Sequence, residues 1–395
     1  MVVVGSAPSA PTVATVSRPR LLFIDNLRWT IIILVISMHA ADTYSPLGNW
    51  YFVDRKPVSA AVLLTFAAWQ MYLQSFFMAL LFFIAGTLVP ASFDRKGPLR
   101  FLRERAFRLG LPVLFYMFVL GPITEYYCAH SWNSTEPTSF ANEWVKHIRN
   151  GEFLQESGPL WFCLALLIFS LVYVVLRVLL PGKDGRDEYG QAPGTGKLAG
   201  FAIAMASLTF LVRLALPSGA SFLNMHLGDF PQYILLFTAG ILAARGQWLS
   251  KFSNSLGIRW LAIGLPVGFA AWFIILRAGG AFAGKDTTYS GGWHWQAGCL
   301  NLWESFTCVT MCYGLLVVFR EAFNWQGGLA KFLSDNAFSV YVFHPPIVIM
   351  AARMLHYLPW PPILKFVILT CIGVVVSFAL SAAVFRRIPL LRRIL

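Results

Sequence analysis

Two side chains in the first apolar stretch of the sequence could do chemistry, Arg28 and His39. Residues Trp29 to Met38 lie between them, so at about 100° per residue both project from nearly the same face of a helix, about 16.5 Å apart. A neutral imidazole can take a proton near pH 7, because its ordinary pKa is about 6.5. Asp42 follows one turn later on that face and could orient the ring. The spacing favours a general base at His39.

The same pattern also has a structural interpretation. A histidine inside a bundle can hydrogen-bond between helices, and an arginine at the inner end of a helix can extend its guanidinium to lipid phosphate. Both interpretations remain open from spacing alone.

Three further ionisable side chains interrupt or border apolar stretches: Arg213, Glu304 and His344. At the centre of a spanning helix such a group costs about 2.5–3.5 kcal/mol on insertion scales, so each needs a partner or a role. Arg213 is expected to be buried and paired, or linked to function. Glu304 is expected at the outer interface or lining a cavity. His344 precedes Pro345 and Pro346, so it is expected to line a cavity or to pack as a satisfied histidine. We assign the three as candidate substrate-binding residues.

The densest basic segment is 100–108, which contains Arg103 and Arg105. Guanidinium groups bind phosphates through paired hydrogen bonds, so this segment could hold an anionic co-substrate. The alternative is a topology signal beside anionic lipid. The sequence contains no Walker loop, GxGxxG, HExxH or GxSxG motif, which argues against nucleotide hydrolysis, a Rossmann cofactor, zinc proteolysis and an α/β-hydrolase.

The six cysteines show no CxxC pair and no zinc-ligand spacing. Cys308 and Cys312 share a helix face, but two thiols without a second ligand pair make a weak metal site. We therefore expect no metal and interpret the cysteines as small apolar side chains. A disulfide between Cys128 and Cys299 outside the membrane is the alternative for that pair.

These residues belong to a chain whose composition excludes a soluble protein. Of its 395 residues, 57% are hydrophobic and 12% are charged, against about 45–50% and about 25% in an ordinary soluble chain. The lysine and arginine residues that give the net charge of +13 lie mostly at the ends of apolar stretches. The composition therefore predicts the lipid bilayer, and not nucleic acid, as the partner of this charge.

Apolar stretches long enough to span about 30 Å of hydrocarbon recur from residue 23 onward. They predict an all-α polytopic membrane protein with about ten helices in one bundle, of which 230–245 is short for a span. Residues 1–19 predict a disordered cytoplasmic tail, and 20–395 one transmembrane domain. The predicted spans are 27–45, 60–90, 107–127, 159–180, 198–217, 230–245, 258–278, 299–320, 334–354 and 364–385.

Lysine and arginine residues between the spans gather on one side of the membrane. The N-terminal segment, the 95–108 loop and the C-terminal 386–393 segment all fall on that side. Because cytoplasmic loops carry the excess of positive charge, both termini are predicted to be cytoplasmic.

Short motifs follow one another along the chain: the R-x10-H pair of Arg28 and His39, FFIAG at 82–86, RER at 103–105 before GLP at 110–112, GPLWF at 158–162 and YVFHP at 341–345. In this order they resemble the acyltransferase 3 family of multi-helix membrane O-acyltransferases. The RIPLL ending at 387–391 and the Trp161-Phe162 context resemble most the glucan biosynthesis protein C group, which is associated with succinylation of periplasmic glucans. The single His344 and the presence of Asp42 depart from that group's pattern.

The resemblance implies transfer of an acyl group from a cytoplasmic donor, succinyl-CoA or acetyl-CoA, to a hydroxyl of an extracytoplasmic glucan or other saccharide. It implies that Arg28 and His39 are the essential pair and that Arg103, Arg105 and Arg28 handle the donor. His39 would act as general base or as a covalent acyl relay, with Asp42 beside it. It further implies a bacterial inner-membrane enzyme without a tightly bound cofactor.

Aromatic residues are frequent in the predicted outer loops 128–158 and 279–298, among them Trp293 and Trp295. Such rings can pack against the apolar faces of sugars, although an interfacial aromatic belt would give the same composition. We assign both tryptophans as candidate acceptor-binding residues.

Two other functional classes fit parts of the pattern. A secondary transporter, or a flippase for a sugar- or lipid-linked substrate, would also have buried arginine and histidine along its path. Inverted repeats with broken helices would favour it, and no such repeat is visible in the sequence. A membrane scaffold without chemistry would have little use for Arg28, His39 and Arg213.

Overall fold

The computed structural model describes residues 21–54, 56–130, 139–154, 157–180, 190–284 and 287–392, and this part of the chain is almost entirely helical. Ten helical segments within it are long and apolar enough to cross a membrane, which confirms the predicted all-α polytopic fold. The segment predicted at 230–245 extends over Leu227–Gly246, the length that a spanning helix needs. The tail predicted at residues 1–19 lies outside the described residues.

Nine of the ten segments are centred on single long helices: α1 (Leu22–Tyr44), α2 (Ala60–Lys96), α7 (Trp161–Leu179), α8 (Thr195–Arg213), α9 (Phe230–Gly246), α11 (Asn254–Gly279), α12 (Trp295–Ala322), α13 (Gly328–His356) and α14 (Pro362–Ala383). The remaining one is composite and contains α3 (Pro98–Arg105), η1 (Ala106–Gly110), α4 (Leu111–Phe115), η2 (Tyr116–Leu120), α5 (Gly121–Ile123) and η3 (Thr124–His130). Short connecting elements include α6 (Phe140–Arg149), α10 (Trp248–Lys251), α15 (Pro389–Arg392) and the hairpin β1 (Ser221–Phe222) to β2 (Met225–His226).

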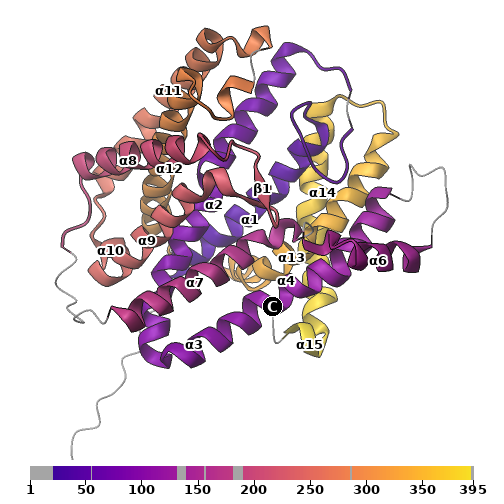
Figure 1. Cartoon of the computed structure of the whole chain (residues 1–395), viewed down its shortest axis with the longest axis horizontal. Helices are drawn as coiled ribbons and strands as arrows, with labels where there is room; N and C mark the ends of the chain where they lie inside the picture. Colours follow the sequence, from indigo (N-terminus) through magenta and orange to yellow (C-terminus); the bar gives the residue numbers. More distant parts are fainter. Residues whose placement is uncertain are drawn as a thin grey trace, which may run out of the picture.

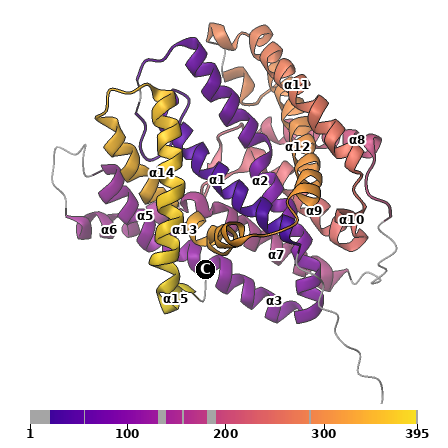
Figure 2. The same cartoon turned by 180° about the vertical axis from the view of Figure 1, so that it is seen from behind.

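Helix α1 lies in the middle of the bundle, with α8, α9, α11 and α12 to one side and α13 and α14 to the other (Figures 1 and 2). Its buried residues face both ways. Ile31 and Val35 belong to an apolar cluster shared with α2, α7, α9 and α12, whereas Ile32 and Ile36 belong to a second cluster with α13 and α14. Because residues four apart share a helix face, adjacent faces of one helix join the two halves of the core.

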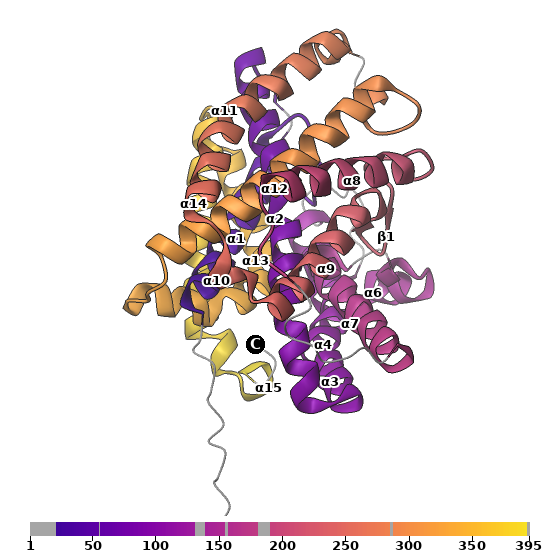
Figure 3. The same ribbon diagram turned by 90° about the vertical axis from the view of Figure 1, so that its left-hand side faces the viewer.

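Helices α2 and α9 pack closely against each other, and this packing depends on two glycines. A Cβ atom at Gly86 would overlap the carbonyl oxygen of Phe237, and one at Gly240 would overlap that of Phe83. Without the gain from removing apolar surface from water, membrane helices associate through van der Waals contact, which small residues permit at short range. The pair therefore holds α2 firmly beside α9 (Figure 3).

Prolines explain the irregular form of the composite helix. A proline ring clashes with the carbonyl four residues earlier and has no N–H to bond to it. Those carbonyls belong to residues 108 and 118 for Pro112 and Pro122, and both lie in the π-helical turns η1 and η2. The wider turns remove the hydrogen bonds that the prolines could not make, so the segment stays helical.

The described cysteines carry free thiols, so the alternative disulfide between Cys128 and Cys299 is absent. Cys308 and Cys312 are buried with their Sγ atoms 3.9 Å apart. Their burial agrees with the interpretation as small apolar side chains.

Alternation of the spans defines two ends of the bundle. We call the end where α1 finishes and α2 begins the His39 end; α8 also finishes there, and α9, α12 and α14 begin there. The opposite end, where α1 begins and α3 follows α2, we call the Arg28 end. Helices α3 and α15 lie at this end, along the lower edge of Figures 1 and 2.

Candidate active site

A loop that folds back over the end of α1 covers His39. We call residues 45–59, apart from the undescribed residue 55, the strap. A Cβ atom at Gly48 would overlap the backbone carbonyl of Asp42, so only glycine lets the chain return this closely. Further along, the backbone N–H of Asp54 donates to the carbonyl of Thr43 at 2.8 Å. The strap is therefore held against the helix that it follows.

His39 lies near the C-terminal end of α1, closer to that end than to the middle of the helix, and its ring lies between two other rings. The indole of Trp50, from the strap, is stacked on it with centroids 4.2 Å apart and planes 12° apart. The imidazole of His344, from α13, is stacked at 5.3 Å and 18°. The side chain of His39 remains 20% exposed, so the ring can be reached by its edge.

Asp42 contacts the edge of this ring. Its Oδ2 atom lies 3.4 Å from Nδ1 of His39, and its Oδ1 accepts a 2.7 Å hydrogen bond from the amide of Gln70 on α2. The two atoms are in contact but do not form a hydrogen bond, as is common in catalytic pairs without substrate. A carboxylate in this position would favour a proton on Nδ1 and leave the Nε2 lone pair free to accept another.

His344 owes its orientation to the prolines that follow it. Pro345 has no N–H, so the carbonyl of Tyr341, four residues earlier, lacks its usual helical partner. Nδ1 of His344 donates to this carbonyl at 2.9 Å, which makes Nε2 the acceptor in the neutral ring. Nε2 is buried and has no hydrogen-bond partner among the described residues. Helix α13 therefore runs unbroken past the two prolines, and a side chain of the same helix bonds the carbonyl that Pro345 cannot.

Arg213 is buried at the end of α8 and is fully paired at its two terminal nitrogens. Nη1 donates to side-chain oxygens of Glu304 at 2.7 Å and Asn301 at 2.5 Å, both on α12. Nη2 donates at 2.6 Å to Asp229, in the turn η6 (Leu227–Asp229) before α9. Arg213 thus joins three helical segments, and Glu304 is its ion-pair partner, an assignment that the sequence did not make.

Two glutamines on α2 bring this ion cluster close to His39. Gln70 donates to Asp42 as described, and Gln74, one turn further, donates to Asp229 at 3.4 Å. Polar side chains therefore follow one face of α2 between the two groups. A pair of glutamines four residues apart within an apolar stretch was a usable sequence signal for this face, and the sequence reasoning missed it.

The two candidate acceptor-binding tryptophans lie at the surface. Trp293 is 81% exposed and Trp295 is 54% exposed, and the Trp293 ring packs against Phe210 of α8 with centroids 5.7 Å apart. Neither contacts His39. Trp50, which does, escaped the sequence reasoning because a single tryptophan in a short loop carries no periodic signal.

The three arginines predicted to bind the donor lie at the Arg28 end. The guanidinium of Arg28 is 45% exposed and lies 3.6 Å from Asp25. Arg103 is exposed on α3, and Arg105 lies over the ring of Phe101, 5.2 Å from its centroid. The structure therefore brings His39, Asp42 and His344 together and leaves the arginines at the other end.

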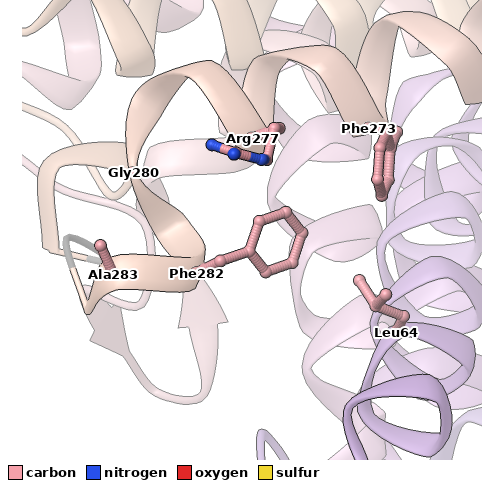
Figure 4. A pocket seen from close by; sticks show the side chains of 6 residues that line it. All are labelled: Leu64, Phe273, Arg277, Gly280, Phe282 and Ala283. Atoms are coloured by element: carbon pink, nitrogen blue, oxygen red, sulfur yellow. The ribbon is translucent and has the colours of Figure 1, made fainter.

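An open pocket of about 500 Å³ lies elsewhere, between the start of α2 and the end of α11 (Figure 4). Leu64, Phe273, Phe282 and Arg277 line it together with Gly280 and Ala283. None of these residues belongs to the group around His39, so the pocket is separate from the candidate site.

Comparison with known protein families identifies the domain that this chain contains. A model of an acyltransferase domain matches residues 21–382, which is nearly the whole chain. No curated protein and no solved structure matches. The match supports an enzyme over the transporter or flippase considered from the sequence. Together with ten candidate spans, it shows that the chain belongs to the acyltransferase 3 family of membrane acyltransferases.

Proposed function

We propose that this acyltransferase moves a succinyl or acetyl group from cytoplasmic acyl-CoA to a hydroxyl of an extracytoplasmic glucan or other saccharide, with His39 as the general base. The observation that carries the proposal is the contact between Nδ1 of His39 and Asp42. Because Nδ1 is engaged by Asp42, Nε2 would be the ring nitrogen that faces the substrate.

The chemical step needs a base because a neutral hydroxyl attacks a thioester poorly. As the hydroxyl oxygen attacks the carbonyl carbon, Nε2 of His39 takes its proton, and Asp42 stabilises the imidazolium that forms. The carbon–sulfur bond then breaks, and the departing CoA thiolate receives the proton from His39. A covalent acyl-histidine relay is the variant that follows if the donor reaches His39 before the acceptor does.

Donor and acceptor would approach from opposite ends. Arg28, Arg103 and Arg105 lie at the Arg28 end, where the exposed guanidiniums of Arg28 and Arg103 and the half-buried one of Arg105 can hold the phosphates of CoA. From there the flexible arm of CoA would extend along α1 toward His39. The saccharide would enter at the His39 end, where Trp293 and Trp295 offer exposed rings. Arg213 and Glu304 would hold the helices around the reacting groups in position, and His344 would hold the ring of His39.

The resemblance of the 387–391 ending to the glucan biosynthesis protein C group supports a periplasmic glucan as acceptor and succinyl as acyl group. It also supports a bacterial inner membrane as the location. The excess of lysine and arginine at the Arg28 end supports cytoplasmic termini.

The test is transfer by the purified protein. Succinyl-CoA and acetyl-CoA are each incubated with a periplasmic glucan, and acylated glucan is measured by mass spectrometry for the wild type and His39→Gln. His147→Gln is the matched control, because His147 is also buried but bonds to the carbonyl of Met117, outside the site. Product from the wild type and the control, but not from His39→Gln, is expected. Equal product from all three would refute the role of His39.

A further inference from the structure

The imidazole of His39 is confined on both faces. Trp50 covers one face at 4.2 Å and His344 covers the other at 5.3 Å. Nδ1 on one edge lies beside Asp42. The ring can therefore neither turn over nor tilt far without displacing a neighbour. Only the remaining edge can meet a substrate.

The three neighbours are themselves held in different ways. The His344 side chain is hydrogen-bonded to the carbonyl of Tyr341, and the Asp42 side chain to the amide of Gln70. Both side chains are therefore held in place by the helices. Trp50 is held by the strap, which turns sharply at Gly48. Past the turn, the buried carboxylate of Asp54 accepts hydrogen bonds from Lys365 at 3.2 Å and His356 at 3.0 Å. The strap is therefore fixed on both sides of Trp50 in the sequence, and this fixes the position of the indole.

We propose that Trp50 is a positioning residue of the transfer reaction, whose indole face holds the His39 ring edge-on to the acceptor and stabilises the positive charge that the ring gains with the proton. The proposal rests on the proposed role of His39 as base. Trp50 would matter most in the transition state, when that charge develops.

The charge distribution around His39 favours this role for Trp50. A cation over an aromatic face is attracted by the ring, and tryptophan gives the largest effect. The groups that contact the imidazole from its own helix and from α13 are Asp42 and His344. His344 donates through Nδ1 to a carbonyl and offers no negative charge, and Asp42 acts at the ring edge. The stabilising contact on the ring face therefore comes from Trp50.

The first test distinguishes the effect of the aromatic face of Trp50 from the effect of its size. Trp50→Leu keeps an apolar side chain and removes the ring, whereas Trp50→Phe keeps a flat ring. For Trp50→Leu we expect kcat for saccharide acylation to fall about 10-fold with the KM for acyl-CoA unchanged, and for Trp50→Phe we expect most of kcat to return. The control Trp360→Leu changes a tryptophan at the same end that is 40% exposed and lies outside the strap, and it should behave as wild type. Equal kcat for the leucine and phenylalanine variants would overturn the proposal.

The second test displaces the strap without touching Trp50. Gly48→Ala adds a Cβ where the carbonyl of Asp42 lies, so the turn must open. Carbethoxylation of His39 by diethylpyrocarbonate, followed by mass spectrometry of its peptide, should be several-fold faster in Gly48→Ala than in the wild type. His147 in the same sample is the internal control. Unchanged labelling of His39 would mean that the strap does not cover it.

These outcomes are distinguishable from failure of the proposed function. If His39→Gln keeps full transfer, the base assignment is wrong whatever Trp50 does. If His39→Gln is inactive and Trp50→Leu is normal, only the role of Trp50 is wrong.

Discussion

The two ends of the bundle present their ionisable side chains in opposite ways. At the His39 end, Arg213 is 4% exposed and bonded to two carboxylates, and His39 is stacked between two rings. At the Arg28 end, the guanidiniums of Arg28 and Arg103 face outward. A reacting group needs a fixed position, because small displacements cost much of the rate. A phosphate contact tolerates movement. This difference supports the proposal that the chemistry takes place at one end of α1 and the donor binds at the other.

The largest effect is expected from the ion cluster around Arg213. Arg213→Met removes the guanidinium and leaves the carboxylates of Asp229 and Glu304, which are 11% and 20% exposed, without their cation, and this should cost about 3–5 kcal/mol of stability. Thermal unfolding in detergent measures the loss. Arg277→Met, an exposed arginine on α11, is the control and should unfold as the wild type does. An unaltered midpoint for Arg213→Met would show that the ion cluster contributes little.

The next effect isolates the orientation of the base. Asp42→Asn keeps the shape of the side chain but removes the charge beside Nδ1 of His39, so kcat should fall about 10-fold, less than for loss of the base itself. Steady-state acylation measures it. The control Asp335→Asn removes a carboxylate that pairs only with Lys331 among the contacts found for it. The role assigned to Asp42 fails if both variants have the kcat of the wild type.

At the Arg28 end the effect should be smaller and of another kind. Arg103→Ala or Arg105→Ala should raise the KM for acyl-CoA several-fold and leave kcat nearly unchanged, because a phosphate contact remote from the reacting carbon acts equally in ground and transition states. High salt should reduce the difference from wild type. Arg100→Ala, on the same helix and bonded to Glu104, is the control. A change of topology without a change in KM would identify the segment as a targeting signal.

The smallest effect concerns the acceptor. Trp293→Ala and Trp295→Ala should each raise the KM for the saccharide a few-fold, since one stacking contact contributes about 0.5–1.5 kcal/mol. Hydrolysis of acyl-CoA without acceptor should be spared. Trp325→Ala, an exposed tryptophan at the Arg28 end, is the control. If both activities fall together, these rings support the fold and the sugar binds elsewhere.

The sequence predicted well those features that depend on residues close together along the chain. Spanning helices follow from runs of apolar residues, and the neighbourhood of His39 and Asp42 follows from one turn of α1. The burial of Arg213 followed from the cost of an unpaired charge in an apolar run.

What the sequence could not predict depends on packing between distant segments. His344 meets His39 because α13 packs on α1, and no spacing within either helix specifies that face. Glu304 was expected at the interface or in a cavity, and it pairs with Arg213 because α12 packs against α8. Trp50 reaches His39 only because Gly48 lets the strap turn back.

In the proposed division, the His39 end performs the chemistry and the Arg28 end binds the donor. The most direct test of this division is a steady-state comparison of His39→Gln with Arg105→Ala in one acyl-CoA titration at saturating saccharide. We expect His39→Gln to lower kcat by about 10²–10⁴-fold with the KM for acyl-CoA unchanged, and Arg105→Ala to raise that KM and preserve kcat. Wild-type kcat in His39→Gln, or a change of the same kinetic parameter in both variants, would show that the two ends are not divided in this way.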